Sequence, residues 1–274
     1  HENYPVAVQS YNYTKGMLRG IVTAPKDWIN KEREYLKLPD QIIVLSEAFK
    51  NTLEKRYDFL QNKITVLPNV IDLEKFENFT VRDINLECKF PTLFYFGAIA
   101  ERRGIFESLD VFKELIAKGE KLCYLIIGPV DKKDRERFES YCTDPTIKDY
   151  IHYIDWIDLS ELISYLKVVD ICLSPLHVND QHESGVANKI YQYMFGKRPL
   201  IVSNCKPQAN LVTQVNCGLV YNNKLEFEDA ILFLINNPKQ AEIMGENGHQ
   251  AIKRKFNFEA VNQEFLGLFE RDGV

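Results

Sequence analysis

The residues best suited to chemistry lie in one segment, Glu183 to Ser203. An apolar strand-like run at 169–173 leads into a polar loop ending in Glu183-Ser-Gly, and a helix and a returning strand at 199–203 are predicted to follow. Small residues at 184, 185 and 187 would let a ligand approach the first helical turn, where unpaired N–H groups and the helix dipole favour anions. Lys189 adds a mobile positive charge. The segment predicts a phosphate site with the Glu183 carboxylate beside the attached group, although most strand-to-helix turns bind nothing.

Two further loops lie at matching places between strands and helices. In the loop 96–105, Gly97 and Gly104 bracket Arg102 and Arg103, so backbone amides and guanidinium groups could hold one oxyanion. Paired arginines are more often a solvated face, and the loop lacks the Gly-x-Gly-x-x-Gly and Walker signatures of NAD and ATP sites. In the loop 154–158, Trp156 could receive a flat base or simply pack.

A metal site is the weaker interpretation of the loop 176–183. This loop gathers His177, Asp180, His182 and Glu183. No Asp-x-Asp pair exists in the chain to hold a nucleotide-bound cation, so contacts to a hydroxylated ligand fit these residues better.

The elements that must position these loops alternate strictly from about residue 91. Six apolar runs predict strands at 92–96, 122–127, 151–154, 169–173, 199–203 and 217–221, with amphipathic helical stretches such as 106–117 between them. This order predicts an α/β fold with a Rossmann-like parallel sheet wound on both faces, whose ligands bind at the carboxyl ends of the strands. Two helices are predicted at 238–256 and 258–271.

Residues 1–80 are organised differently. A helix around 26–36, a strand at 41–45, a helix capped by Ser46 that runs to about Arg56, and a strand at 64–67 lead into the turn-rich stretch 68–72. This is too short to complete a sheet, and we interpret it as the closing third of another α/β domain.

Composition places the chain among ordinary globular proteins. It has 274 residues, 45% hydrophobic and 27% charged, and a net charge of −5 that argues against a nucleic-acid partner. The six cysteines show no metal-ligand or disulfide spacing, which predicts free thiols and a reducing cytoplasm. No apolar run reaches the length of a membrane span. Basic residues near Met17 and Trp28 suit a membrane surface, but acidic neighbours offset them and a solvated helix face is the better interpretation (Lys15, Arg19, Lys26, Lys31 and Arg33 against Asp27, Glu32 and Glu34).

Several segments in order resemble the retaining, two-domain GT-B glycosyltransferases (group 1, family 4-like). The stretch 66–76 resembles their interdomain segment, 96–104 their phosphate loop, the Glu183 segment their "E…K-l-x-E-Y-m…G-k-P-v-i" motif, and 244–258 their closing helices. Even His1-Glu2 is similar to the end of an acceptor-domain strand. The resemblance implies an acceptor-domain part and linker at 1–80, a donor domain at 81–255 and a helix at 256–274 that packs back toward the N-terminal domain. About a hundred acceptor-domain residues would precede His1.

The resemblance implies a nucleotide-diphosphate sugar as donor and no metal or other cofactor, since basic side chains and the helix dipole stabilise the departing diphosphate. Glu183 would bond hydroxyls of the sugar, while Arg103 and Lys189 would hold the leaving phosphate. These three are the expected catalytic residues. The expected donor-binding residues are Gly97, Arg102, Gly104, Trp156, Ile157, His177, Ser184, Gly185, Val186, Ala187, Asn188 and Gln192.

Two positions depart from the family pattern. Ala98 stands where the family has a loop arginine, and the second glutamate, expected on the ribose, aligns with Gln192, or with Tyr191 by strict count from Glu183. The leading interpretation is a bacterial, cytoplasmic retaining glycosyltransferase, with the inner face of the membrane as an alternative location, acting on a polysaccharide or lipid-linked acceptor. The alternatives are a truncated or non-catalytic donor-binding module and, with less support, a sugar-nucleotide epimerase, which would need more carboxylates near the sugar than Glu183.

Overall fold

The computed structural model describes residues 25–271, which form parts of two compact units. The first unit takes in the chain up to Asn69 together with Val178–Val186. The second takes in Val70–His177 and the chain from Ala187 onward. The predicted acceptor-strand motif His1-Glu2 and the basic residues Lys15 and Arg19 lie outside the described residues.

The first unit contains the helices and strands that its sequence predicts. Its elements are α3 (Pro25–Tyr35), β1 (Ile42–Val44), α4 (Glu47–Arg56), the 3-10 turn η1 (Asp58–Leu60) and β2 (Ile64–Val66), with η5 (His182–Ser184) from the later segment. β1 and β2 pair in parallel, with Ile42 opposite Ile64. The predicted cap of α4 is confirmed, because the Ser46 hydroxyl accepts a 3.1 Å hydrogen bond from the Phe49 amide.

Some charged and aromatic side chains of α3 form contacts within this unit. Glu32 accepts hydrogen bonds from Arg56 at 2.9 Å and from the Tyr57 hydroxyl at 2.7 Å. The Lys31 ammonium lies 4.9 Å from the centre of the Trp28 ring. Within residues 25–271 no helix has both the length and the apolar character needed to span a bilayer.

The second unit contains the predicted six-stranded parallel sheet. The strands are β3 (Thr92–Phe96), β4 (Cys123–Ile127), β5 (Ile151–Ile154), β6 (Ile171–Ser174), β7 (Leu200–Ser203) and β8 (Gly218–Tyr221), in the order β5-β4-β3-β6-β7-β8. The main helices are α5 (Leu73–Glu77), α6 (Ile105–Ala117), α7 (Arg135–Cys142), α8 (Leu162–Val168), α9 (Asn188–Phe195), α10 (Lys206–Val215), α11 (Lys224–Asn236), α12 (Pro238–Arg254) and α13 (Phe258–Arg271). The prediction of a doubly wound Rossmann-like sheet is therefore confirmed.

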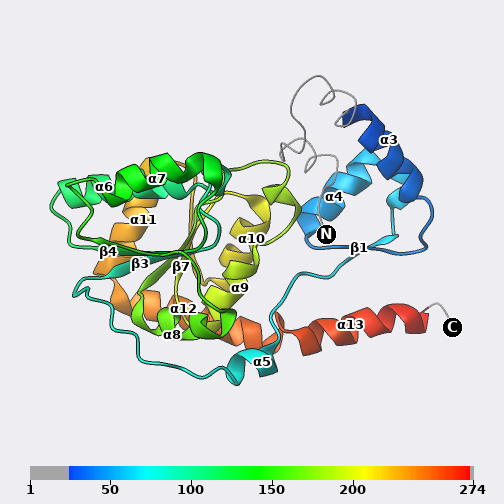
Figure 1. Cartoon of the computed structure of the whole chain (residues 1–274). Helices are drawn as coiled ribbons and strands as arrows, with labels where there is room; N and C mark the ends of the chain where they lie inside the picture. Colours follow the sequence, from blue (N-terminus) through cyan, green and yellow to red (C-terminus); the bar gives the residue numbers. More distant parts are fainter. Residues whose placement is uncertain (1–24, 272–274) are drawn as a thin grey trace. The chain divides into compact units, whose positions relative to one another are not determined.

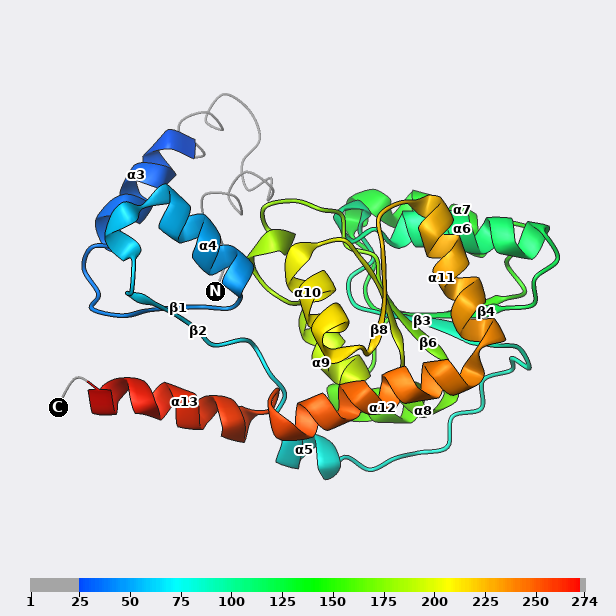
Figure 2. The ribbon, with the colours of Figure 1, turned by 180° about the vertical axis from the view of Figure 1, so that it is seen from behind.

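Helices cover both faces of this sheet. α6, α7 and α11 lie on one side, and α8, α9 and α12 lie on the other (Figures 1 and 2). The chain leaves β3 toward β4 and β5, then returns to the far side of β3 for β6, β7 and β8. Right-handed crossovers in the two directions place their helices on opposite faces. The direction reverses between β3 and β6, and this switch point is where open α/β sheets bind their ligands.

Aromatic and aliphatic residues of the central strands fill the core. Every residue of β4 is buried, as expected for a strand covered on both faces. Tyr124 packs edge-on against Phe112 of α6 with ring centres 5.4 Å apart. Its hydroxyl lies 2.7 Å from the Ser108 hydroxyl, so both buried polar groups have a partner.

The prediction that the cysteines form no disulfide was wrong. Cys88, in the loop before β3, is joined to Cys123 at the start of β4, with Cα atoms 6.4 Å apart. The two are 35 residues apart in sequence, and only the parallel pairing of β3 with β4 brings them together. In the part of the chain that the structure describes, Cys142, Cys172, Cys205 and Cys217 take no part in a disulfide.

Candidate functional site

Two glycines shape the loop that follows β3. Gly97 has a φ of +136° and Gly128, after β4, has a φ of +144°. A Cβ at Gly128 would lie 2.2 Å from the Gly97 carbonyl oxygen, so the two strand ends approach more closely than side chains would allow. The Ile99 amide then donates to the Pro129 carbonyl at 2.9 Å. Gly128-Pro129, which the sequence suggests only as a strand end, therefore supports the loop after β3.

Gly104 brings this loop against the segment that follows β6. It has a φ of +70°, and a Cβ there would lie 1.6 Å from the Pro175 carbonyl oxygen. Only glycine satisfies both the backbone conformation and this approach. The loops after β3 and β6 therefore meet at the switch point, where the sequence places Arg103 and Lys189.

Lys189 and Arg103 are the unusual pair of the site. Lys189 is only 8% exposed, and its ammonium lies 3.8 Å from the centre of the Tyr95 ring on β3. Lys189 Nζ and Arg103 Nε are both buried, and neither has a hydrogen-bond partner among residues 25–271. Burial lowers the pKa of Lys189 well below its usual value, and the positive charge of Arg103 lowers it further. The buried Lys189 amine and the partly buried Arg103 guanidinium therefore disfavour each other's positive charge, an arrangement that an anion would relieve.

The expectation that Lys189 is a mobile charge was wrong. A Cβ at Gly97 would lie 3.4 Å from Lys189 Nζ, so the ammonium sits directly against the loop after β3. Tyr95 is fully buried, and its hydroxyl donates to the Ala98 carbonyl at 2.8 Å. Burial raises the pKa of Tyr95, while the positive charges of Arg103 and Arg102 lower it by smaller amounts. The ring stays neutral, and its face stabilises the ammonium.

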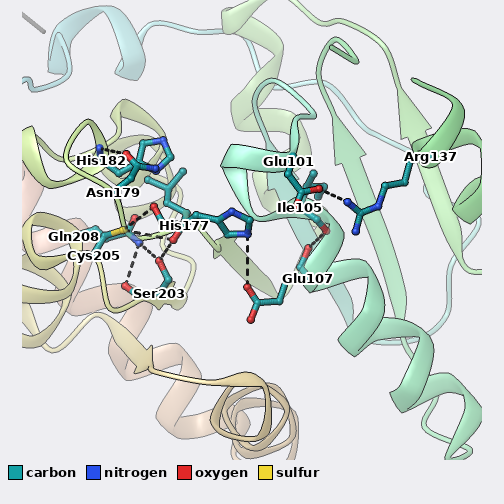
Figure 3. Close-up of polar contacts among 12 residues, drawn as sticks. Glu101, Ile105, Glu107, Arg137, His177, Asn179, His182, Ser203, Cys205 and Gln208 are labelled. Carbon is teal, nitrogen blue, oxygen red and sulfur yellow. Dashed lines mark hydrogen bonds and ion pairs between the residues drawn. The ribbon is translucent and has the colours of Figure 1, made fainter. Parts of the chain in front are cut away.

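Arg102 is tied to the neighbouring loop. Its guanidinium donates a 2.8 Å hydrogen bond to Asp131, in the segment after β4, and both side chains are about one-third exposed. The adjacent Glu101 forms an ion pair with Arg137 of α7 (Figure 3). Arg102 therefore already has a carboxylate partner, whereas Arg103 Nε has none among the described residues. Of the two arginines, Arg103 is the better suited to bind a phosphate.

His177 is positioned by the loop after β6. Its Nε2 lies 4.0 Å from a Glu107 carboxylate oxygen in the first turn of α6 (Figure 3). Behind it, buried Gln208 donates to the Ser174 carbonyl at 3.1 Å and to the Ser203 hydroxyl at 2.9 Å. Ser203 in turn donates to the Leu176 carbonyl at 2.5 Å. These bonds hold together the carboxyl ends of β6 and β7 and the backbone that carries His177.

The predicted start of the helix after Glu183 was wrong by about three residues. α9 begins at Asn188, with Ala187 as its N-cap, and Gly185 has an extended backbone with a φ of −171°. The unpaired amides of the first turn therefore begin at Asn188, not at residue 184. The pattern misplaced the start because small polar residues suit a 3-10 turn and an extended link as well as a helix cap.

The structure also separates the two candidates for the ribose contact. Tyr191 is 1% exposed and packs against Phe256 with ring centres 5.7 Å apart. Gln192 is partly exposed on the same helix. Of the two, only Gln192 offers a polar group that a ligand could reach.

Trp156 and Ile157 differ in exposure. Trp156 is 69% exposed, whereas Ile157 is 7% exposed. Asp158 caps the following turn by accepting a 2.8 Å bond from the Ser160 amide, and Glu161 completes a capping box. The carboxyl end of β5 therefore presents an exposed indole on a well-ordered turn.

Glu183 and its neighbours belong to the first unit. The Glu183 amide donates to the Asn179 carbonyl at 2.9 Å, while Asn179 Oδ1 accepts from the His182 amide at 2.9 Å and Nδ2 lies 3.0 Å from the His182 ring (Figure 3). The Ser46 hydroxyl donates to the Ser184 carbonyl at 3.0 Å. A Cβ at Gly185 would lie 3.3 Å from Leu45 Cβ, and Val186 ends this segment. That Glu183, Ser184, Gly185 and Val186 serve the same ligand as Arg103 and Lys189 stays a prediction.

Sequence reasoning missed Tyr95, Glu107 and Gln208. None carries a motif, since a strand tyrosine, a helix glutamate and a buried glutamine are common. Tyr95 could have been suspected from its place two residues before Gly97, because that position borders the loop. Glu107 and Gln208 act through partners about 70 and 34 residues away, which no local pattern indicates.

The strand order β5-β4-β3-β6-β7-β8, with the basic residues Arg103 and Lys189 at the switch point, defines the class of protein. This is a GT-B-like α/β fold, the fold of nucleotide-sugar glycosyltransferase domains. The chain belongs to the glycosyl transferases group 1 family, whose model matches residues 90–237.

Curated relatives agree with this family. A capsular polysaccharide biosynthesis glycosyltransferase, CapM of Staphylococcus aureus, is 25% identical over 245 residues, covering 83% of this chain and 60% of CapM. The chain thus spans less than two thirds of that relative.

Solved structures show the same fold. Sucrose-phosphate synthase from Thermosynechococcus elongatus superposes with a TM-score of 0.74 at 18% identity, covering 97% of this chain and 65% of that one. HepE of Anabaena, solved in complex with UDP and glucose, gives a TM-score of 0.67 at 11% identity over 85% of this chain and 64% of its own.

Proposed function

We propose that this chain is the donor-binding part of a retaining glycosyltransferase that transfers a sugar from a nucleotide-diphosphate donor to a glycan or lipid-linked acceptor. One observation carries the proposal: Lys189 Nζ and Arg103 Nε are buried and without a hydrogen-bond partner within the described chain, at the switch point of a doubly wound sheet. A buried charge without a counter-charge is costly, and a diphosphate would supply the missing charge.

Each residue has a role in this proposal. Arg103 and Lys189 bind the distal phosphate and stabilise the charge that develops as the bond to the sugar breaks. The first turn of α9, from Asn188, adds amide donors and the positive end of its dipole. Glu183 accepts hydrogen bonds from hydroxyls of the donor sugar, and Gln192 bonds the ribose.

The base and the remaining donor contacts come from neighbouring loops. Trp156 presents an exposed indole on which a base can stack, and His177 lies beside the loop containing Gly97 and Gly104. Basic side chains supply the electrostatic stabilisation, so we expect the reaction to need no metal ion or cofactor. The acceptor would attack from the face that the leaving phosphate occupies, which gives retention.

The parts of the chain would divide this work. Residues 81–255 bind the donor, residues 1–80 contribute the end of the acceptor domain, and the helix within 256–274 packs back toward that domain. The similarity to a capsular polysaccharide glycosyltransferase supports a cell-surface glycan or its lipid-linked precursor as acceptor. We place the transfer in the cytoplasm, with the inner face of the membrane as the alternative location.

The test is direct binding of donors and their nucleotides. Isothermal titration with nucleoside diphosphates and their glucose or N-acetylglucosamine conjugates should yield at least one ligand with micromolar affinity. Arg103→Gln should weaken that ligand at least tenfold, and the exposed Arg254→Gln should not. A full panel without binding, or equal affinities for the two variants, would contradict the proposal.

A second function, donor binding without turnover, is favoured by Ala98 and Gln192, which replace charged residues of the family pattern. The two proposals separate in an assay that follows release of the nucleoside diphosphate from the bound donor. Slow hydrolysis that disappears in Glu183→Ala supports a transferase. Tight binding with no release in either protein supports the binding module.

A further inference from the structure

Three potential metal ligands meet far from the site described above. Cys88, Cys123 and His152 each place a sulfur or ring nitrogen so that these atoms all lie within 4.8 Å of one another. Cys123 is the first residue of β4, so the cluster lies at the amino end of the sheet. The loops with Arg103 and Lys189 follow the carboxyl ends of the strands. The cluster is therefore independent of the proposed function.

Strand register places two of the three on one face. Side chains alternate along β4, so Cys123 and Leu125 point to the same side of the sheet. His152 of β5 is the parallel partner of Leu125. Its imidazole therefore shares that face with Cys123, one step along the neighbouring strand. Tyr153 points to the opposite face, where it packs against Phe138 of α7 with ring centres 4.9 Å apart.

The chain segment before β3 delivers the third ligand. The Arg82 amide donates to the Ser164 hydroxyl of α8 at 2.9 Å, so the segment follows the face that α8 covers. At its end the Phe90 amide donates to Cys88 Sγ at 3.4 Å, and the Thr92 amide donates to the Asp170 carboxylate at 2.7 Å. These contacts hold Cys88 over the start of β4.

A disulfide between Cys88 and Cys123 does not explain the state of the neighbouring His152 side chain. Its Nε2 is buried and has no hydrogen-bond partner in the described part of the chain. A buried polar atom left in this state costs about 1–3 kcal/mol, and most such atoms in native proteins have a partner. With the ring proton on Nδ1, Nε2 offers a lone pair beside two sulfurs, which is the donor set that zinc prefers.

We propose that, with Cys88 and Cys123 reduced, these two thiolates and the His152 imidazole bind a zinc ion. A dithiol reductant supplies two electrons and two protons to the disulfide and is itself oxidised to a disulfide. Zinc then displaces the two thiol protons to solvent, the neutral imidazole donates its lone pair, and water takes the fourth position. Ligand atoms on one zinc ion lie roughly 4 Å apart, so small rotations of the cysteines suffice to close the site.

Binding would fasten the segment before β3 to the sheet, because one ligand comes from that segment and two from β4 and β5. A metal that binds only the folded state stabilises it, so the melting temperature of the reduced protein should rise with zinc concentration. In the oxidised protein the disulfide takes both sulfurs, and zinc should have no such effect.

The experiment uses the 274-residue chain reduced with a non-chelating phosphine under nitrogen. Cobalt(II) titration should give thiolate-to-cobalt charge-transfer bands that saturate at one equivalent, and zinc should displace the cobalt. Cys88→Ser and His152→Gln should each lower the zinc affinity at least about tenfold. Cys142→Ser, which removes a free cysteine on α7, should leave it unchanged.

Circular dichroism of each variant confirms that loss of binding is not loss of fold. Cys88 and His152 are partly exposed, which makes their replacement milder than that of buried Cys123. Absence of binding by the reduced wild type would overturn the proposal and leave a structural disulfide. Unchanged affinity in His152→Gln would overturn it as well, because the imidazole would not be a ligand.

Discussion

Replacing Lys189 with methionine tests the central feature of the site. Methionine keeps an unbranched chain of similar volume over the Tyr95 ring, so the packing around it should survive. The ammonium is buried, without a hydrogen-bond partner among the described residues, and beside a second cation. Removing it takes away a desolvation cost and a repulsion, so we expect the free energy of unfolding of the ligand-free protein to stay the same or increase.

Binding should change in the opposite direction. A hydrogen bond to a charged group contributes about 1.5–3 kcal/mol, so its loss should weaken nucleoside-diphosphate binding by roughly 10- to 150-fold. Isothermal titration measures this change, with the exposed Lys148→Met as the matched control. A variant that binds the diphosphate as tightly as wild type would refute the reasoning. So would one that loses ligand-free stability as a core truncation does.

The lowered pKa of Lys189 gives the same experiment a proton signature. Between that lowered pKa and the ordinary lysine value of about 10.4, the unfolded chain binds more protons than the folded one. Stability contributed by this group therefore rises with pH across that window. A bound diphosphate favours the charged ammonium, so binding should take up protons in the same window. Titrations in buffers of different ionisation enthalpy measure the uptake, which Lys189→Met should abolish.

Three further outcomes follow from the geometry. Gly104→Ala should destabilise the protein by more than about 3 kcal/mol in urea unfolding, because its Cβ would fall 1.6 Å from a carbonyl oxygen. Gly119→Ala, also at positive φ but with no described atom within 4 Å, should cost only about 1 kcal/mol, and equal losses would contradict the close-approach account. Tyr95→Phe removes one buried hydrogen bond and should lower the free energy of unfolding by about 1 kcal/mol in the same assay. Its affinity for the diphosphate should stay within about threefold of wild type, because the ring under Lys189 is kept. A collapse of that affinity would show that the hydroxyl matters and the ring face does not. Burial lowers the pKa of His249 below its ordinary value of about 6.5, so its contribution to stability is complete above that value and is lost as the pH falls through the lowered pKa. The difference between wild type and His249→Gln, measured by urea unfolding from about pH 7.5 to about pH 5, should shrink toward the acid end, and a constant difference would disprove the shift.

The sequence by itself determined the architecture of the second unit and the loops that matter. Alternating apolar runs and amphipathic stretches predict a parallel sheet wound on both faces, because a strand buried on both sides must be apolar throughout. Gly97 and Gly104 mark the loop after β3 because both have a positive φ, which glycine adopts at the least cost. Ser46 marks the start of α4 because its hydroxyl replaces a missing backbone acceptor.

Only the tertiary structure decided what the site residues do. The sequence identifies Lys189 as a basic residue but does not show that it is buried. Its burial depends on Tyr95, which comes from a strand more than ninety residues earlier. The start of α9 moved to Asn188 because small residues permit several backbone conformations and the neighbouring packing selects one. Cys88, Cys123 and His152 meet only through strand pairing, and their spacing along the chain carries no trace of it. Local pattern specifies elements, whereas burial and long-range pairing specify the chemistry of the groups they carry.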